Sequence, residues 1–333
     1  MEDPTKLEQD ERFAQLRAAL ATPGEDSWEE ILRLFKSWPE ESLKLAISYA
    51  KVHLKEWPYH FRKYPAGMMW FELLEKPKDW PIHKIAMTLD LTSNEMGSRG
   101  IQSILDSKKI TNIRGLGLGE NEIGFSGIHA IATSKKMKRL RLLDLNDNYI
   151  DDNCAIALAE SQVLKQLEIL DLGFGTISDQ GVSAIANSTT LSKLKTLVLS
   201  FNRIGPLGIE AIIESKTFRR LEELYLRGAP FDVETLEKLA CSKTLKHLQL
   251  LKIDHSTVEN EGLIALTQSK TLTKLQKLYL SRCNVQDAAV EAIASSEALK
   301  GLELLDLRGN SIGEAAKQNL MASDLLQGTK ILL

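Results

Sequence analysis

The feature that most constrains this chain is an internal repeat of 27 residues. The segment LRLLDLNDNYI at 140–150 follows the pattern L-x-x-L-x-L-x-x-N-x-I, and the same frame returns at 194–204 and 302–312. With the asparagine as the reference position, every step is 27 residues, without insertion or deletion. The nine reference residues are Asn94, Asn121, Asn148, Gly175, Asn202, Ala229, Ser256, Cys283 and Asn310. Such a period is typical of solenoids built from one supersecondary unit per repeat.

Each unit reads as a strand followed by a helix. The L-x-L core alternates as a short strand does, with its leucines inward, so that stacked copies are expected to form a parallel sheet. In the segment 123–134, Ile128, Ile131 and Ala132 stand at i, i+3 and i+4, which predicts an amphipathic helix packed on that sheet. We expect each reference asparagine to bond backbone groups of the following turn, and the four other residues to break this ladder.

A serine recurs near the end of every predicted helix. The nine positions are Ser107, Ser134, Ser161, Ser188, Ser215, Ser242, Ser269, Ser296 and Ser323. This row predicts a structural hydroxyl that bonds the last helical carbonyls. An array of phosphorylation sites is the alternative interpretation.

These motifs resemble the ribonuclease-inhibitor-like class of leucine-rich repeats over about residues 82–333. The resemblance implies an α/β solenoid: a βα horseshoe of nine repeats, with the parallel sheet on the concave face and the helices outside. The class includes ribonuclease inhibitor, Ran GTPase-activating protein and the sensor arms of immune receptors, and most members bind proteins. It therefore implies a non-enzymatic scaffold for a protein partner. A GTPase-regulating protein similar to Ran GTPase-activating protein is the alternative.

The chain is expected to have two domains, a helical cap at 1–81 and the solenoid at 82–333. The five tryptophans all lie in the first 80 residues: Trp28, Trp38, Trp57, Trp70 and Trp80. Helices are predicted at 11–20, 27–38 and 42–57. Ser27 is the expected N-cap of the second helix, and Glu30 completes a capping box.

The expected inward residues of the third helix include Leu45. The segment 16–39 resembles the helical regions that precede leucine-rich repeats in some bacterial, especially myxobacterial, proteins. At the other end, 330–333 is expected to start a tenth strand, with Leu332 one step of 27 after Leu305.

Composition narrows the class of protein. The net charge of −3 argues against a general nucleic-acid binder, which carries a basic excess. The three cysteines are too few and too scattered for a disulfide framework. The sequence has neither an apolar run of about 18 residues nor a signal-peptide centre near its start. We therefore expect a cytoplasmic monomer that binds neither nucleic acid nor membrane.

Candidate binding residues are the outward positions of the strands and of the turns that follow them. The first half of this face is acidic, and the second half combines aromatic and basic residues. The residues expected to bind a protein partner are Asp144, Asp147, Asp171, Phe174, Phe201, Tyr225, Arg227, Lys252, His255, Tyr279 and Arg282. Aromatic side chains next to arginine are typical of interface hot spots, and charges of both signs orient a partner. The expected centre is formed by Phe174, Phe201 and Tyr225.

The sequence lacks the common catalytic motifs H-E-x-x-H and C-x-x-C, and it gives no support for an enzyme. The run G-L-G-L-G at 115–119 fits the strand frame and lacks the G-K-[ST] of a phosphate loop. We predict no catalytic residue, no cofactor and no metal; a cation held by Asp144, Asp147 and Asp171 is the alternative to an acidic binding patch. The basic stretch 51–64 is either a second docking site or a solvated helix end.

Overall fold

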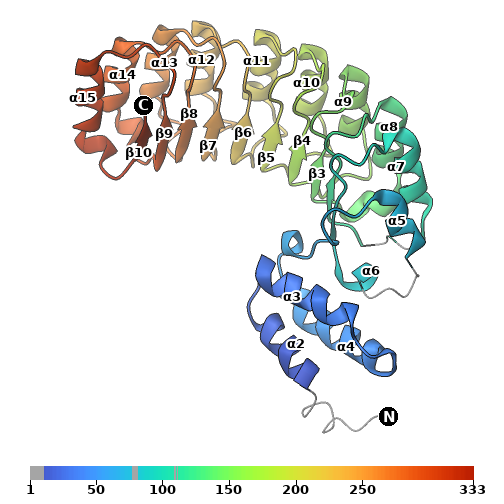
Figure 1. The fold of residues 1–333 in the computed structure, drawn as a ribbon. Helices are drawn as coiled ribbons and strands as arrows, with labels where there is room; N and C mark the ends of the chain where they lie inside the picture. Colours follow the sequence, from blue (N-terminus) through green and yellow to red (C-terminus); the bar gives the residue numbers. More distant parts are fainter. Residues whose placement is uncertain (1–10, 77–81, 109, 111) are drawn as a thin grey trace.

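The computed structural model describes residues 11–76, 82–108, 110 and 112–333. It shows a curved stack of repeats with a group of helices at its N-terminal end (Figure 1). Ten strands form one parallel sheet in chain order, β1 to β10, so that each unit pairs with its neighbours in the sequence. The predicted βα solenoid is therefore confirmed. Trp80 and residue 81, the predicted end of the cap, lie outside the described residues.

Each strand is three residues long. The strands are β1 Thr88–Asp90, β2 Gly115–Gly117, β3 Leu142–Asp144, β4 Ile169–Asp171, β5 Thr196–Val198, β6 Glu223–Tyr225, β7 Leu250–Lys252, β8 Lys277–Tyr279, β9 Leu304–Asp306 and β10 Lys330–Leu332. Leu143 stands opposite Leu170 and both are fully buried. The middle residue of each strand thus supports the core, and the outer two lie on the concave side.

The helices stand on the opposite side of the sheet (Figure 1). They are α7 Gly97–Asp106, α8 Phe125–Thr133, α9 Asp152–Ala159, α10 Asp179–Ala186, α11 Pro206–Glu214, α12 Val233–Ala240, α13 Asn260–Thr267, α14 Asp287–Ala294 and α15 Glu314–Met321. Short 3-10 turns are η3 Lys135–Arg139, η4 Glu297–Leu299 and η5 Asp324–Leu326. The predicted stripe of Ile128, Ile131 and Ala132 is buried against the sheet.

The asparagine ladder is present, but it joins each turn to the turn before it. The Asn121 Nδ2 group donates to the carbonyls of Leu91, Leu118 and Gly119, and its Oδ1 accepts from the N–H groups of Asn94 and Met96. The predicted bonds within the turn after the strand are also present, to Leu118 and Gly119, whereas the bonds to the preceding repeat were not predicted. The amide satisfies buried backbone groups of two repeats at once.

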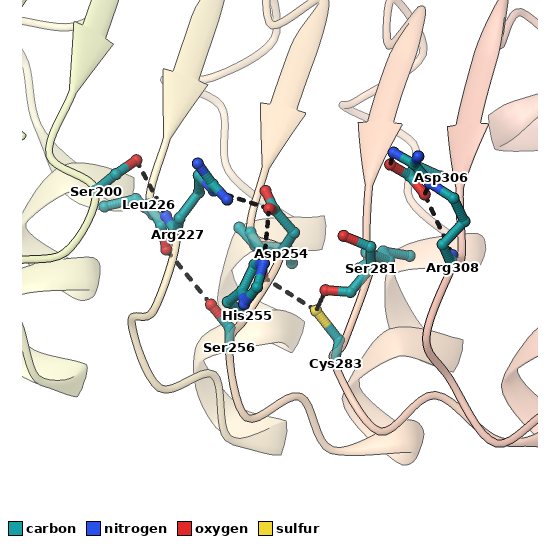
Figure 2. Close-up of polar contacts among 12 residues, drawn as sticks. Ser200, Leu226, Arg227, Asp254, His255, Ser256, Ser281, Cys283, Asp306 and Arg308 are labelled. Carbon is teal, nitrogen blue, oxygen red and sulfur yellow. Dashed lines mark hydrogen bonds and ion pairs between the residues drawn. The ribbon is translucent and has the colours of Figure 1, made fainter. Parts of the chain in front are cut away.

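Two of the four substituted rungs keep a weaker bond to the same carbonyl position. The Cys283 thiol donates to the Ile253 carbonyl at 3.1 Å, and the Ser256 hydroxyl donates to the Leu226 carbonyl at 3.4 Å. Figure 2 shows Ser256 and Cys283 beneath the ends of the strands.

The serine row forms a second ladder between repeats. The Ser188 hydroxyl donates to the carbonyl of Ala159, the last residue of α9, and its oxygen accepts from the N–H groups of Thr190 and Leu191. The same bond joins Ser215 to the Ala186 carbonyl. Both serines are buried. The structural interpretation is confirmed for the seven serines from Ser161 to Ser323, with the difference that each of them bonds a carbonyl of the helix of the preceding repeat.

The helices before β1 are α2 Glu11–Ala21, α3 Glu25–Lys36, α4 Glu40–His53, η1 Leu54–Glu56, η2 Tyr59–Phe61 and α5 Trp70–Glu75 in the predicted cap, followed by α6 Ile82–Ile85. The predicted start of the second helix was wrong, because α3 begins after Gly24 and Ser27 lies inside its first turn. Glu25 and Asp26 already place negative charge at that end, where the helix dipole favours it. Glu30 pairs with Arg33 at 2.6 Å and does not reach back to the N-cap.

The prediction for Leu45 was also wrong, since Ala46 takes the inward position on α4 and Leu45 is exposed.

The cap closes the first edge of the sheet. Lys63 forms a parallel bridge with Thr88, and the Asn94 Oδ1 accepts from the N–H of Trp70 at the start of α5. The buried Arg62 guanidinium donates to the carbonyls of Ile85 and Leu54. Burial lowers the pKa of Arg62 to about 10. Part of the basic stretch 51–64 is therefore structural, and it covers backbone groups that an open edge would expose.

The last strand closes the other edge with a shift of one residue. Ile331 stands opposite Leu305, and Leu332 stands opposite Asp306, so Leu332 does not take the predicted position. The reason is a shorter connection: Ile331 comes five positions after Leu326, whereas Leu305 comes six positions after Leu299. Gly328 makes this shorter turn with a φ of 89°.

Candidate functional site

The predicted binding residues lie in three rows on the concave side of the sheet. Asp144, Asp171, Tyr225, Lys252 and Tyr279 are the last residues of β3, β4, β6, β7 and β8, and all five are half-buried. Arg227 lies two residues beyond β6. The third row directly precedes the reference position and contains Asp147, Phe174, Phe201, His255 and Arg282.

The third row has a left-handed backbone in every repeat. Its φ values lie between 51° and 77° at Ser93, Glu120, Asp147, Phe174, Phe201, Gly228, His255, Arg282 and Gly309. Seven of these nine residues carry a side chain, although this region favours glycine. The conformation is held by the next repeat: the N–H of Phe174 donates to the Ser200 carbonyl, and the N–H of Phe201 to the Arg227 carbonyl. Large side chains are thus presented from a turn whose backbone is already paired.

Phe201 is the centre of a small aromatic cluster. Its ring lies 4.6 Å from the ring of Phe174 and 6.2 Å from that of His255, and the Arg227 guanidinium stacks on it at 4.9 Å. His255 is two repeats away, and Gly228 stands in the repeat between them. A Cβ at Gly228 would lie 3.1 Å from the Phe201 ring. The absence of a side chain at Gly228 therefore lets the two rings approach.

Of the three residues predicted to form the centre of the binding site, only Phe174 and Phe201 have rings in contact. The Tyr225 hydroxyl donates to Glu223 Oε2 at 3.2 Å, and in the described part of the chain no ring contact joins Tyr225 to Phe174 or Phe201. Burial raises the pKa of Tyr225, and the nearby Glu223 carboxylate raises it further. Phe174, by contrast, is 49% exposed. The accessible aromatic surface is the Phe174–Phe201 pair.

A hollow of about 440 Å³ lies beyond the ends of β6 to β9. We call it the basic basin; it is lined by Arg227, Lys252, Tyr279, Arg282 and Arg308 together with the carboxylates of Asp254 and Asp306. Arg227 Nε donates to Asp254 Oδ2 at 2.8 Å, and Arg308 Nη2 donates to Asp306 Oδ2 at 2.7 Å (Figure 2). Lys252 Nζ stacks over the Tyr279 ring at 4.6 Å.

The acidic end of the face is a row of carboxylates on adjacent strands. Asp171 Oδ1 accepts from the N–H of Gly173 at 2.8 Å, and Asp144 Oδ1 accepts from that of Asn146 at 2.9 Å. Burial raises the pKa of Asp171 to about 6, against the lowering effect of the Gly173 bond. Burial and the carboxylate of Asp90 also raise the pKa of Asp144. This row is therefore crowded with negative charge at neutral pH.

Of the three cysteines, Cys241 is exposed and the other two are buried. Within the described ranges, no group of three or more histidine, cysteine or acidic side chains is arranged to hold a metal ion. Cys154 and Cys283 are buried, and burial raises their pKa values to about 12 and about 11. Both thiols therefore stay protonated at neutral pH.

Sequence reasoning missed two groups on this face. The first strand residues Leu142 and Ile169 are half-buried next to the acidic row; strand alternation, which puts them on the same face as Asp144, was the available signal. The other is the burial of Asp254 and Asp306, which the sequence places on this face and which pair with Arg227 and Arg308. No sequence signal marks that pairing.

The comparisons with known proteins identify the repeat. A family model described as "Leucine Rich repeat" matches residues 87–105, 165–186, 190–212 and 271–294. No curated protein sequence matches this chain. Over the described residues, the helices are all too short or too polar to cross a membrane.

Three solved structures illustrate the likeness. A crystal structure of an internalin (inlF) from Listeria monocytogenes is 17% identical over 76% of this chain and 74% of that one, with a TM-score of 0.42. The crystal structure of a TLR13–ssRNA13 complex is 18% identical over 84% of this chain and 37% of that one, with a TM-score of 0.47. The yeast Rad7–Elc1 complex is 12% identical over 98% and 96%, with a TM-score of 0.48.

Proposed function

Because the chain is a leucine-rich-repeat protein, we propose that it is a non-enzymatic scaffold that binds a partner protein on the concave face of its arch. Leucine-rich-repeat proteins are generally protein-interaction scaffolds. The observation that carries the proposal is the Phe174–Phe201 pair with Arg227 stacked on it. Exposed aromatic rings next to arginine have the composition of an interface hot spot.

The backbone of the proposed binding site is already held in place before a partner binds. The turns of Phe174 and Phe201 are fixed by hydrogen bonds to the next repeat, so the backbone loses little freedom on binding. The concave face further offers carboxylates at one end and the basic basin at the other. Opposite charges at the two ends orient a partner along the arch. The proposal includes a cytoplasmic monomer, in keeping with three unpaired cysteines.

The test is to capture partner proteins on immobilised protein and compare matched variants. Phe174→Ser and the double variant Phe201→Ser with Tyr225→Ala are expected to lose the captured partner. Phe125→Ser is the control, because Phe125 is also 49% exposed but lies at the start of α8, on the helical side. Equal capture by the variants on both sides of the arch would contradict the proposal.

The GTPase-regulating alternative has its own assay. Stimulated GTP hydrolysis by a small GTPase from the same organism would replace the scaffold proposal. No residue of this chain is assigned a catalytic role in it.

A further inference from the structure

The basic basin carries two cations that form no ion pair with the described residues. Its two carboxylates are already matched, Asp254 by Arg227 and Asp306 by Arg308. Lys252 and Arg282 form no ion pair with any residue that the structure describes. Four cations against two carboxylates leave a formal excess of two positive charges in a hollow of about 440 Å³. Such a site attracts an anionic group.

The basin also holds an unsatisfied acceptor. The Asp254 side chain is only 5% exposed, and Oδ2 takes the bond from Arg227. Oδ1 is buried with no hydrogen-bond partner among the described residues. A buried carboxylate oxygen without a donor is costly, and natural structures seldom keep one that nothing ever fills. The missing partner is an N–H or O–H group.

We infer that the basic basin receives an acidic peptide segment of the partner protein. A carboxylate of the segment pairs with Lys252 and Arg282. Asp254 Oδ1 is covered in the free protein, so the side chains over it shift aside as the segment binds, and a backbone N–H of the segment then donates to it. This inference rests on the proposed function, since it assigns the partner's chemistry at one end of the concave face. A peptide supplies both groups at once, because each acidic residue carries an amide donor next to its carboxylate.

A nucleic acid fits this face less well. A phosphate backbone needs a continuous basic track, and the same face bears Asp144, Asp147 and Asp171 towards its other end. Lys252 lies over one face of the Tyr279 ring, where it competes with a stacked base. A fully ionised phosphate has acceptors only, so it would leave Asp254 Oδ1 unfilled.

The probe is a fluorescein-labelled hexaglutamate peptide, with hexaglutamine as its uncharged match, measured by fluorescence anisotropy on the full chain. We expect hexaglutamate to bind, and to bind more weakly as salt rises. Lys252→Glu and Arg282→Glu are expected to weaken binding by at least about tenfold. Lys216→Glu changes the net charge equally at an exposed position after α11, and is expected to change binding by less than about twofold.

Asp254→Asn separates the proposed geometry from a simple sum of charges. The variant makes the basin more positive, so charge alone predicts tighter binding of hexaglutamate. In our geometry the amide oxygen stays with Arg227 Nε, because two donors cannot face each other. The amide NH₂ then replaces Oδ1 and opposes the peptide N–H, so binding weakens. Unaltered circular dichroism of each variant shows that the loss is not one of folding.

The outcomes distinguish this inference from the proposed function. Three results would each overturn the assignment of the basic basin, even if partner capture still depends on Phe174. They are no binding of hexaglutamate, equal effects of Lys252→Glu and Lys216→Glu, and tighter binding of hexaglutamate by Asp254→Asn. Equal or tighter binding of a single-stranded oligothymidylate, or of inorganic phosphate as competitor, would overturn the choice of a peptide. If hexaglutamate binds but Phe174→Ser does not reduce partner capture, the result would support the basic basin and contradict the Phe174–Phe201 pair as the centre of the binding site.

Discussion

Asn121→Ala removes one rung of the asparagine ladder and is expected to destabilise the solenoid strongly. The Asn121 side chain is fully buried and makes five hydrogen bonds to backbone groups, at distances from 2.7 to 3.2 Å. With a net value of about 1 kcal/mol for each bond, the free energy of unfolding should fall by about 4–5 kcal/mol. Alanine can offer neither donor nor acceptor to those groups.

Two further asparagine variants test the expected loss of unfolding free energy for Asn121→Ala. Asn202 makes three such bonds, to the Ile177 N–H and to the carbonyls of Leu172 and Leu199, so Asn202→Ala should cost about 3 kcal/mol. Asn153 is exposed on α9, and Asn153→Ala should change stability by less than about 0.5 kcal/mol. The order of the three costs follows the number of bonds lost.

Urea unfolding followed by two probes provides the assay. Tryptophan fluorescence reports the cap, since all five tryptophans lie in the first 80 residues, and far-ultraviolet circular dichroism reports all repeats. Coincident transitions permit a single free energy, whereas separate ones mean that the units unfold in parts. A cost for Asn121→Ala below about 1 kcal/mol, or equal to that of Asn153→Ala, would refute the ladder as a source of stability.

Three further predictions concern the acidic row, the serine ladder and the last strand. The folded pKa of Asp171, about 6, exceeds the ordinary 3.8, so its ionisation costs stability as pH rises through this window and has no effect below it. Asp171→Asn keeps an acceptor for Gly173 and should raise the free energy of unfolding by roughly 1–3 kcal/mol at pH 8, but hardly at pH 4; an equal gain at both pH values would contradict this. Ser188→Ala should cost about 1–3 kcal/mol by thermal unfolding, whereas the half-buried Ser134, whose hydroxyl has no bond to the described residues, should tolerate alanine. Deletion of 329–333 uncovers the edge of β9 and should raise aggregation seen by light scattering; unchanged scattering would speak against that role.

Much of the fold was readable from the chain because its period is strict. A leucine every second residue and an apolar stripe at i, i+3 and i+4 are local requirements of strand and helix, so Leu143 and Ile128 were predicted to be buried and are. The cap has no internal repeat, so each of its helix boundaries is predicted from one segment alone. The start of α3 was therefore missed by two residues, where Glu25 and Asp26 satisfied the helix end without Ser27.

The concave surface depended on contacts that periodicity does not encode. Phe201 contacts His255 across Gly228, where a Cβ would lie 3.1 Å from the Phe201 ring, and the buried Asp254 carboxylate accepts a hydrogen bond from Arg227 of the preceding repeat. These contacts join side chains at least 27 residues apart, through turns with a left-handed backbone that residues such as phenylalanine do not signal. The repeat thus settled which residues face outward, because alternation is a property of each strand. Stacking of the units settled which of them meet, because that depends on the space each neighbour leaves.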